Sequence, residues 1–216
     1  MKFVSLFLSG LVGLAAAQSL DATEFHELVR RDQVTVIETA LYNISNYTAA
    51  LNDEIKNFNI LQLQALNTAT LNSVNAIVSG DAACKKIQPI TTSDALLLTP
   101  IFNNLVPLVE DSINNTIAQK ANLGGLAPVV LQSLKTQQQA TLAFSTTVSG
   151  KLPPALVAYS LKLNQPIFDA LTRGVSEFQK TTVNTDKSVY SSGTATKFAS
   201  SWGTIALAMV VGSLLL

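Results

Sequence analysis

The sequence predicts an all-α fold: an antiparallel bundle of about five amphipathic helices, some of them kinked at proline. Apolar residues recur at intervals of three, four and seven through most of the chain, which is the spacing of one helix face. The strict alternation expected of a β-strand is nearly absent. Glycine and proline divide the periodic stretches, so the connections are short enough to join antiparallel neighbours.

Two apolar stripes define the first two helices. The first stripe comprises Val34, Ile37, Leu41, Ile44, Leu51, Ile55 and Phe58. The second comprises Leu63, Leu66, Val74 and Ile77, and we expect its helix to end at Gly80 because glycine is common just past a helix end. Cys84 then lies beyond the helix, where a small, partly buried side chain is the simplest interpretation. A reactive or intermolecular thiol is the alternative.

Three further helices follow. The third segment, residues 94–125, is densely apolar and closes at Gly124-Gly125, and Pro107 inside it should kink or divide the helix. The fourth runs from about Pro128 to Val148 and stops at Gly150. The fifth opens at Pro153-Pro154, contains Pro166 and continues to about Lys180.

Both ends of the chain have the pattern of processing signals. The first residues carry a basic Lys2, an apolar stretch to about Leu14 and three alanines, and this order predicts a signal peptide at residues 1–17. A membrane-spanning anchor is the alternative. The apolar run at the other end is too short for a spanning helix and has no basic residue after it. Small residues followed by a spacer and this tail predict a glycosylphosphatidylinositol (GPI) anchor signal at residues 194–216, attached at Ser192 or Gly193. An uncleaved tail helix is the alternative.

The predicted domain organisation follows from these signals. A helical domain spans residues 32–180, and a Ser/Thr-rich stalk without apolar periodicity spans residues 181–193. The dibasic pair Arg30-Arg31 could be cut by a secretory-pathway protease, which would make residues 18–31 a short pro-segment. An exposed pair in an intact helix explains it equally well.

The charge pattern argues against nucleic acid as a partner. Only 13% of residues are charged, against about 25% in an ordinary domain. Fourteen basic residues less Lys2 and Lys197 leave 12 in the mature piece, against 14 acidic residues. No basic stripe is present to neutralise phosphates.

Catalytic, metal and cofactor motifs are also missing, so we expect no enzyme. His26 is the only histidine, which excludes multi-histidine metal sites and leaves one partner for a catalytic triad. The carboxylate pairs Asp53-Glu54 and Glu110-Asp111 diverge by about 100° on a helix, so neither converges on one substrate atom. The sequence has no phosphate-binding loop and no dinucleotide fingerprint.

Glycosylation and ligand binding are the remaining signals. Three sequons place N-glycans at Asn43, Asn46 and Asn114, each on the predicted solvent side of its helix. The third and fifth helices are apolar beyond a narrow stripe, so bent helices there could enclose a cavity for an acyl chain or present an apolar face. Plain core is the alternative. The candidate ligand-facing residues are Phe102, Leu105, Val109, Ile167, Phe168 and Leu171.

The whole pattern resembles a known family. Arg31-Asp32 leads into the long helix "QVTVIETALYNISNYTAALNDEIKNFN", followed by a charge-poor helical domain, a stalk and an anchor signal. Over about residues 32–179 the chain is similar to the fungal hydrophobic surface-binding protein A family, which includes cell wall galactomannoproteins. The resemblance implies a secreted, glycosylated protein that binds fatty acids or hydrophobic surfaces, and that in some members recruits secreted hydrolases.

The predicted anchor signal also indicates where in the cell the protein is located. It predicts attachment at the cell surface, through GPI lipid to the plasma membrane or through wall glucan. A structural mannoprotein that displays glycans and binds no ligand is the competing function.

Overall fold

The computed structural model describes residues 22–188, and this part of the chain consists almost entirely of helices joined by short loops. Five helices are long, and the all-α bundle that the periodicity predicts is confirmed. They are α2 (Ala22–Lys56), α3 (Leu63–Lys85), α5 (Thr99–Ala118), α7 (Ala127–Ser149) and α8 (Pro154–Ser188). Short elements join them: α4 (Thr92–Leu97), α6 (Lys120–Leu123) and the 3-10 turns η2 (Ile60–Gln62) and η3 (Gly124–Leu126).

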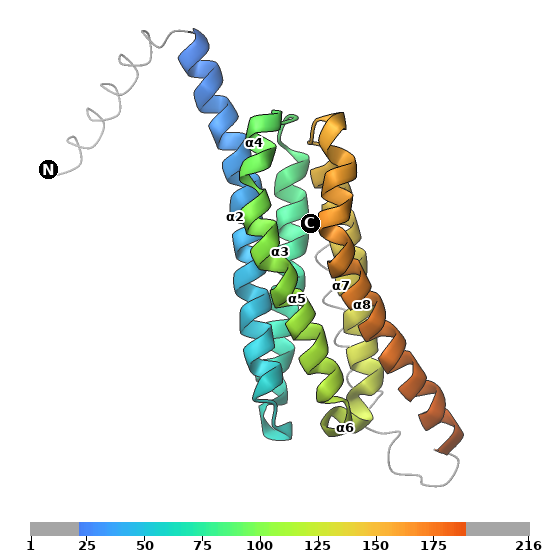
Figure 1. Cartoon of the computed structure of the whole chain (residues 1–216). Coiled ribbons are helices and arrows are strands. Elements are labelled where there is room, and N and C mark those ends of the chain that lie inside the picture. The colour runs from blue at the N-terminus through green and yellow to red at the C-terminus, as the bar shows by residue number, and fades with distance from the viewer. Residues whose placement is uncertain (1–21, 189–216) are drawn as a thin grey trace, which may run out of the picture.

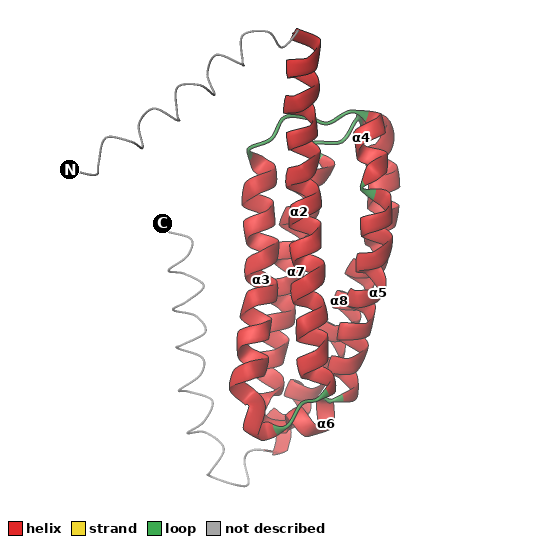
Figure 2. Cartoon of the chain, turned by 90° about the vertical axis from the view of Figure 1, so that its left-hand side faces the viewer, coloured by secondary structure: helices red, strands yellow, loops and turns green. Residues whose placement is uncertain are grey.

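The five long helices pack side by side in one bundle (Figures 1 and 2), and their contacts close it into a ring. Around the ring, α2 packs against α3, α3 against α7, α7 against α8, α8 against α5, and α5 against α2. Each long helix reverses the direction of the one before it in the sequence, as short connections require. Because the ring order differs from the chain order, α2 and α5 run parallel, as do α3 and α7, and α5 and α8.

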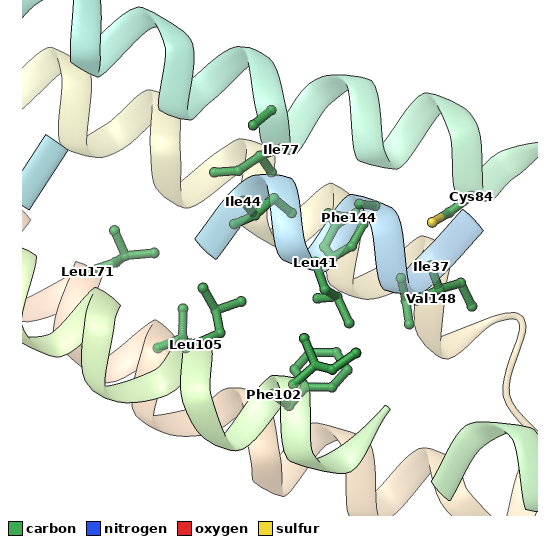
Figure 3. Close-up of a cluster of buried hydrophobic side chains, with 14 of the residues drawn as sticks. Ile37, Leu41, Ile44, Ile77, Cys84, Phe102, Leu105, Phe144, Val148 and Leu171 are labelled. Atoms are coloured by element: carbon green, nitrogen blue, oxygen red, sulfur yellow. The ribbon is translucent and has the colours of Figure 1, made fainter. Parts of the chain in front are cut away.

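The core lies inside this ring and receives side chains from every long helix (Figure 3). Ile37, Leu41 and Phe178 are completely buried, and each such side chain stabilises the fold by about 1.5–3 kcal/mol. Six of the seven residues of the first predicted stripe are buried. The seventh, Phe58, lies just past the end of α2 and is partly buried. The predicted core face of α2 is therefore correct.

The predicted end of the second helix at Gly80 is wrong. Helix α3 passes through Gly80 and ends at Lys85. A Cβ atom on Gly80 would lie 3.1 Å from the Ala40 Cβ and 3.3 Å from a Phe144 ring carbon. Gly80 therefore permits close packing of α3 against α2 and α7 rather than ending the helix. Cys84 consequently lies inside α3 and is fully buried.

The interior prolines do not divide their helices. Both α5 and α8 are continuous through Pro107 and Pro166. The third predicted segment divides instead at Leu98, between α4 and α5, and at Gln119, between α5 and α6. Pro100 stands in the first turn of α5, where its missing N–H leaves no helical bond unmade.

The long helices extend past the expected domain limits. Helix α2 begins at Ala22, so the backbone of Arg30-Arg31 is helical, and the first turns of α2 project beyond α4 (Figure 1). Helix α8 continues to Ser188, so residues 181–188 of the expected stalk are helical. The signal peptide, the rest of the stalk, the anchor signal and its attachment candidates Ser192 and Gly193 lie outside the described residues.

Candidate functional site

A ring of five helices leaves room along its axis. Packed helix axes lie about 8–10 Å apart, so five axes at the corners of a regular pentagon lie about 7–8.5 Å from its centre. A helix with its side chains has a radius of about 5–6 Å. The difference is a central space about 2–3 Å in radius. A methylene group has a radius of about 2 Å, so this space has the width of one acyl chain.

The structure contains a cavity at this place. Its volume is about 50 Å³, and all five long helices line it. The apolar lining residues are Ile44, Leu51, Ile77, Phe102, Leu105, Val109, Ile113, Phe144, Val148, Ile167 and Leu171. On α5 the lining runs from Phe102 to Ile113, a rise of about 16 Å at 1.5 Å per residue. The cavity is therefore long and narrow, and side chains fill most of the space that the ring encloses.

Five of the six candidate ligand-facing residues line this cavity: Phe102, Leu105, Val109, Ile167 and Leu171. Phe168 does not line it and is only partly buried. It follows Ile167 directly, so it points about 100° further around α8 and leaves the inner face. Whether these side chains contact a ligand remains a prediction.

A layer of polar side chains lies toward the end of the cavity that is opposite Phe102 and Val148. Thr48 on α2, Ser73 on α3 and Ser112 on α5 are buried and line it, together with Gln137 and Thr141 on α7. No side-chain hydrogen bond to another described residue is made by these five. A second polar pair lies at the cavity wall, where the Asn164 amide nitrogen donates to the Ser145 hydroxyl at 3.0 Å. The sequence interpretation missed this layer because it followed apolar residues only.

A register signal for the polar layer was nevertheless present in the sequence. Thr48 stands four residues after Ile44 and three before Leu51, which places it within the apolar stripe of α2. Ser112 stands three residues after Val109 in the same way on α5. A hydroxyl that occupies a core position of a helix, and that makes no side-chain hydrogen bond there, indicates a polar site inside the bundle.

The cavity lining is electrically neutral, since it includes no charged residue. Charged groups gather instead where α3 and α7 end. There the Asp81 carboxylate pairs with the Lys85 ammonium at 2.7 Å and accepts a hydrogen bond from Thr147. The Lys151 ammonium donates to the Ile87 carbonyl at 2.6 Å. These contacts join the two helix ends to the adjoining loops.

The thiol of Cys84 lies close to this charged group. The pKa of Cys84 is raised to about 11, mainly by burial and also by the negative charge of Asp81, while the positive charge of Lys151 opposes the rise. A thiol with such a pKa stays protonated at neutral pH and is a poor nucleophile. The interpretation of Cys84 as a packing residue fits this environment. The described residues also contain no group of His, Cys, Asp and Glu side chains that could hold a metal ion.

A comparison with protein-family models shows which family the chain belongs to. The family model described as hydrophobic surface binding protein A matches residues 34–150. The chain belongs to this family. The match begins at Val34, the first buried residue of α2 among residues 31–56, whose burial the structure describes, and it ends just after α7.

Curated relatives of this family member include two proteins named Cell wall mannoprotein 1. The one from Aspergillus flavus is 28% identical over 181 residues, and the one from Aspergillus fumigatus is 29% identical over 185 residues. Each match covers 83% of this chain. The matches cover 63% and 61% of the relatives, so the chain spans about three-fifths of their length.

Solved structures share the same fold. Ligand binding domain 1 of the Penicillium marneffei MP1 protein, complexed with arachidonic acids, is 26% identical with a TM-score of 0.65, covering 68% of this chain and 98% of that domain. AFMP4P in complex with palmitic acid has a TM-score of 0.59, covering 69% of this chain and 99% of that one. At 19% identity the second likeness shows the fold alone.

The three sequon asparagines are exposed, as their helix phases predict. Asn43 and Asn46 lie on α2 and Asn114 on α5. The Asn114 side-chain oxygen accepts a hydrogen bond from the Arg173 guanidinium at 2.8 Å. No helix between Ala22 and Ser188 is long and apolar enough to cross a membrane.

Proposed function

We propose that this family member is a glycosylated cell wall or cell-surface protein whose central cavity binds the acyl chain of a fatty acid. The observation that carries the proposal is the uncharged cavity along the axis of the five-helix ring. Its lining is mostly apolar, and it lies on the axis of the ring, where five packed helices leave room for one methylene chain. The arachidonic acids in ligand binding domain 1 of MP1, which is 26% identical and has the same fold, support this choice of ligand.

The polar layer is the proposed partner of the carboxyl group. A carboxyl group buried without hydrogen bonds costs several kcal/mol, so a neutral cavity requires donors at a defined depth. Thr48, Ser73 and Ser112 supply hydroxyls, and Gln137 supplies an amide nitrogen. In this arrangement the acyl chain extends from the layer toward Phe102 and Val148.

Binding requires the ring to widen. Pockets for small molecules usually measure about 300–1,000 Å³, and the cavity here measures about 50 Å³. The ligand must therefore displace lining side chains and move the helices apart. Pro107 and Pro166 lie in α5 and α8, which are neighbours in the ring. Each proline removes a helical hydrogen bond, so we expect the movement at this pair.

A pair of tryptophan substitutions tests the proposed cavity. Thr141 lines the cavity, whereas its neighbour Leu142 is 58% exposed and outside it. Thr141→Trp should weaken the binding of a fluorescent long-chain fatty acid about tenfold or more, because overpacking the site costs about 1–3 kcal/mol. Leu142→Trp should leave binding unchanged.

Circular dichroism and thermal melting of both variants provide the folding control. Equal loss of affinity in the two variants, with both folded, would show that the ligand binds elsewhere. Absence of binding by the unsubstituted protein would reject the proposal outright.

A spacer function is the second candidate, and the small cavity volume favours it. In this function the bundle displays glycans at the wall and binds nothing. It predicts that lipid neither binds the protein nor raises its melting temperature. The lack of a catalytic constellation is consistent with both functions, and we propose that the protein is not an enzyme.

The attachment of the protein remains part of the proposal. We propose cleavage of a signal peptide at residues 1–17 and GPI attachment at Ser192 or Gly193, with later transfer to wall glucan and recruitment of secreted hydrolases as further steps.

N-glycans are proposed at Asn43, Asn46 and Asn114. The sequon hydroxyls of Thr48 and Thr116 are buried in the folded bundle, at 6% and 7% exposed. We therefore infer that the glycans on Asn46 and Asn114 are added before the helices pack.

A further inference from the structure

A groove runs along the outer face of the bundle between α2 and α3, which lie side by side in Figure 2. Its volume is about 540 Å³, far larger than that of the central cavity. Ala40 and Gly80 are buried at its floor, where a Cβ on Gly80 would lie 3.1 Å from that of Ala40. The small floor residues let the helices approach closely while leaving space above them.

The walls of the groove are polar but uncharged. Asn43 and Tyr47 line it from α2, and Asn72 and Asn75 line it from α3. The three asparagine side chains are exposed and make no side-chain hydrogen bond with another described residue. Each amide offers two donors and an acceptor, and the Tyr47 ring offers an apolar face. Neutral amides beside an exposed aromatic ring suit a neutral sugar, whose hydroxyls bond the amides while its C–H face packs on the ring.

The position of Asn43 points to a particular sugar. Asn43 belongs to the sequon Asn43-Ile44-Ser45, so a glycan on its side chain begins inside the groove. Tyr47 stands four residues later on the same helix face, and its side chain leans back over the turn that carries Asn43. Counting about 1.5 Å per residue from the Ala40–Gly80 contact along the antiparallel pair places Asn75 midway between Asn43 and Tyr47, and Asn72 about level with Tyr47.

We propose that the first N-acetylglucosamine of the N-glycan on Asn43 packs in this groove, against Tyr47 and between the asparagines of α3. The inference rests on the proposed glycosylation of Asn43. The Asn43 glycan is then held against the bundle and covers the α2–α3 seam. Asn46 does not line the groove, so a glycan there projects into solvent and serves as a control within the same chain.

Glycosidase trimming of the native secreted protein tests the proposal. Site occupancy is first measured by peptide mass spectrometry. N-glycosidase should then release the Asn43 glycan about fivefold more slowly than the Asn46 glycan, the factor expected for one modest contact. The difference should vanish after denaturation and in Tyr47→Ala, which keeps both sequons. Tyr42→Ala is the matched control, since Tyr42 is an exposed tyrosine of α2 outside the groove.

Nuclear magnetic resonance supplies the direct observation. With a glycan trimmed to one sugar, the N-acetyl methyl group on Asn43 should show Overhauser contacts with the Tyr47 ring. An occupied Asn43 with equal release rates and no such contacts would overturn the packing while leaving glycosylation intact. An unoccupied Asn43 would remove the premise and with it the proposal. Binding of free chitin or mannan oligosaccharides to the groove of the glycosylated protein would also contradict it, because the groove would then be open.

Discussion

Thr48 shows how this core differs from a purely apolar one. It occupies a core position of α2, yet it carries a hydroxyl that makes no side-chain hydrogen bond with the rest of the described chain. Ser73 and Ser112 repeat the arrangement on α3 and α5. Spacing alone predicts that these positions face inward. It does not predict that they meet at one depth, because that depends on how far each helix is shifted along its neighbours.

Cys84 is the residue whose behaviour follows most directly from burial. Its thiol is completely buried and has a pKa of about 11 in the folded protein. In the unfolded chain the pKa is 9.0, so between pH 9 and pH 11 the unfolded thiol loses its proton first. Folding stability from this group is full below pH 9 and is lost as the pH rises to about 11. The loss amounts to up to about 3 kcal/mol.

Denaturant unfolding as a function of pH checks this prediction. The free energy of unfolding should fall more steeply above pH 9 in the natural protein than in Cys84→Ala, which removes the contribution of lysines and tyrosines common to both. At pH 8 the native thiol should also resist alkylation until the protein unfolds. Rapid alkylation under native conditions, or equal pH slopes, would contradict the buried position.

At the scale of elements, the helices themselves are predictable and several of their ends are not. The stripe of α2 corresponds to its buried face because a helix period of 3.6 is a local property. The predicted end of α3 at Gly80 is wrong because this glycine allows close contact with Ala40, which belongs to another helix. Helix α8 passes Lys180 because loss of apolar periodicity does not by itself end a helix.

Gly80 gives the sharpest test at this scale. Gly80→Val should lower the free energy of unfolding by about 2–3 kcal/mol, because the added methyl groups must push α3 away from α2 and α7. Gly125→Val is the matched control, since nothing lies within 4 Å of a Cβ built there. It should change stability by less than about 0.5 kcal/mol. Chemical denaturation measures both variants, and similar effects in the two would show that Gly80 is not a packing contact.

At the scale of the whole molecule, the closed ring of helices is the feature that could not be predicted from the sequence. Five helix patterns predict a bundle, but the order of helices around it depends on long-range contacts. That order makes α5 and α8 neighbours although α6 and α7 separate them in the chain. It also explains why five of the six candidate residues on these helices meet at one cavity, while Phe168 turns away.

The same ring determines where the central cavity and the α2–α3 groove lie relative to one another. The inner face carries the neutral cavity, and the outer face of α2 and α3 carries the groove at Asn43. If the cavity widens between α5 and α8, the α2–α3 seam stays closed on the far side of the ring. A ligand would then enter without disturbing the groove.

Native mass spectrometry tests the central claim most directly. The deglycosylated protein is stripped of lipid and mixed with an excess of palmitic acid, with a known fatty-acid-binding protein as the positive control. We predict a complex of one protein with one fatty acid, and Thr141→Trp should form much less of this complex than Leu142→Trp does. A spectrum that holds only the unliganded mass, at a lipid concentration that saturates the control protein, would contradict the account.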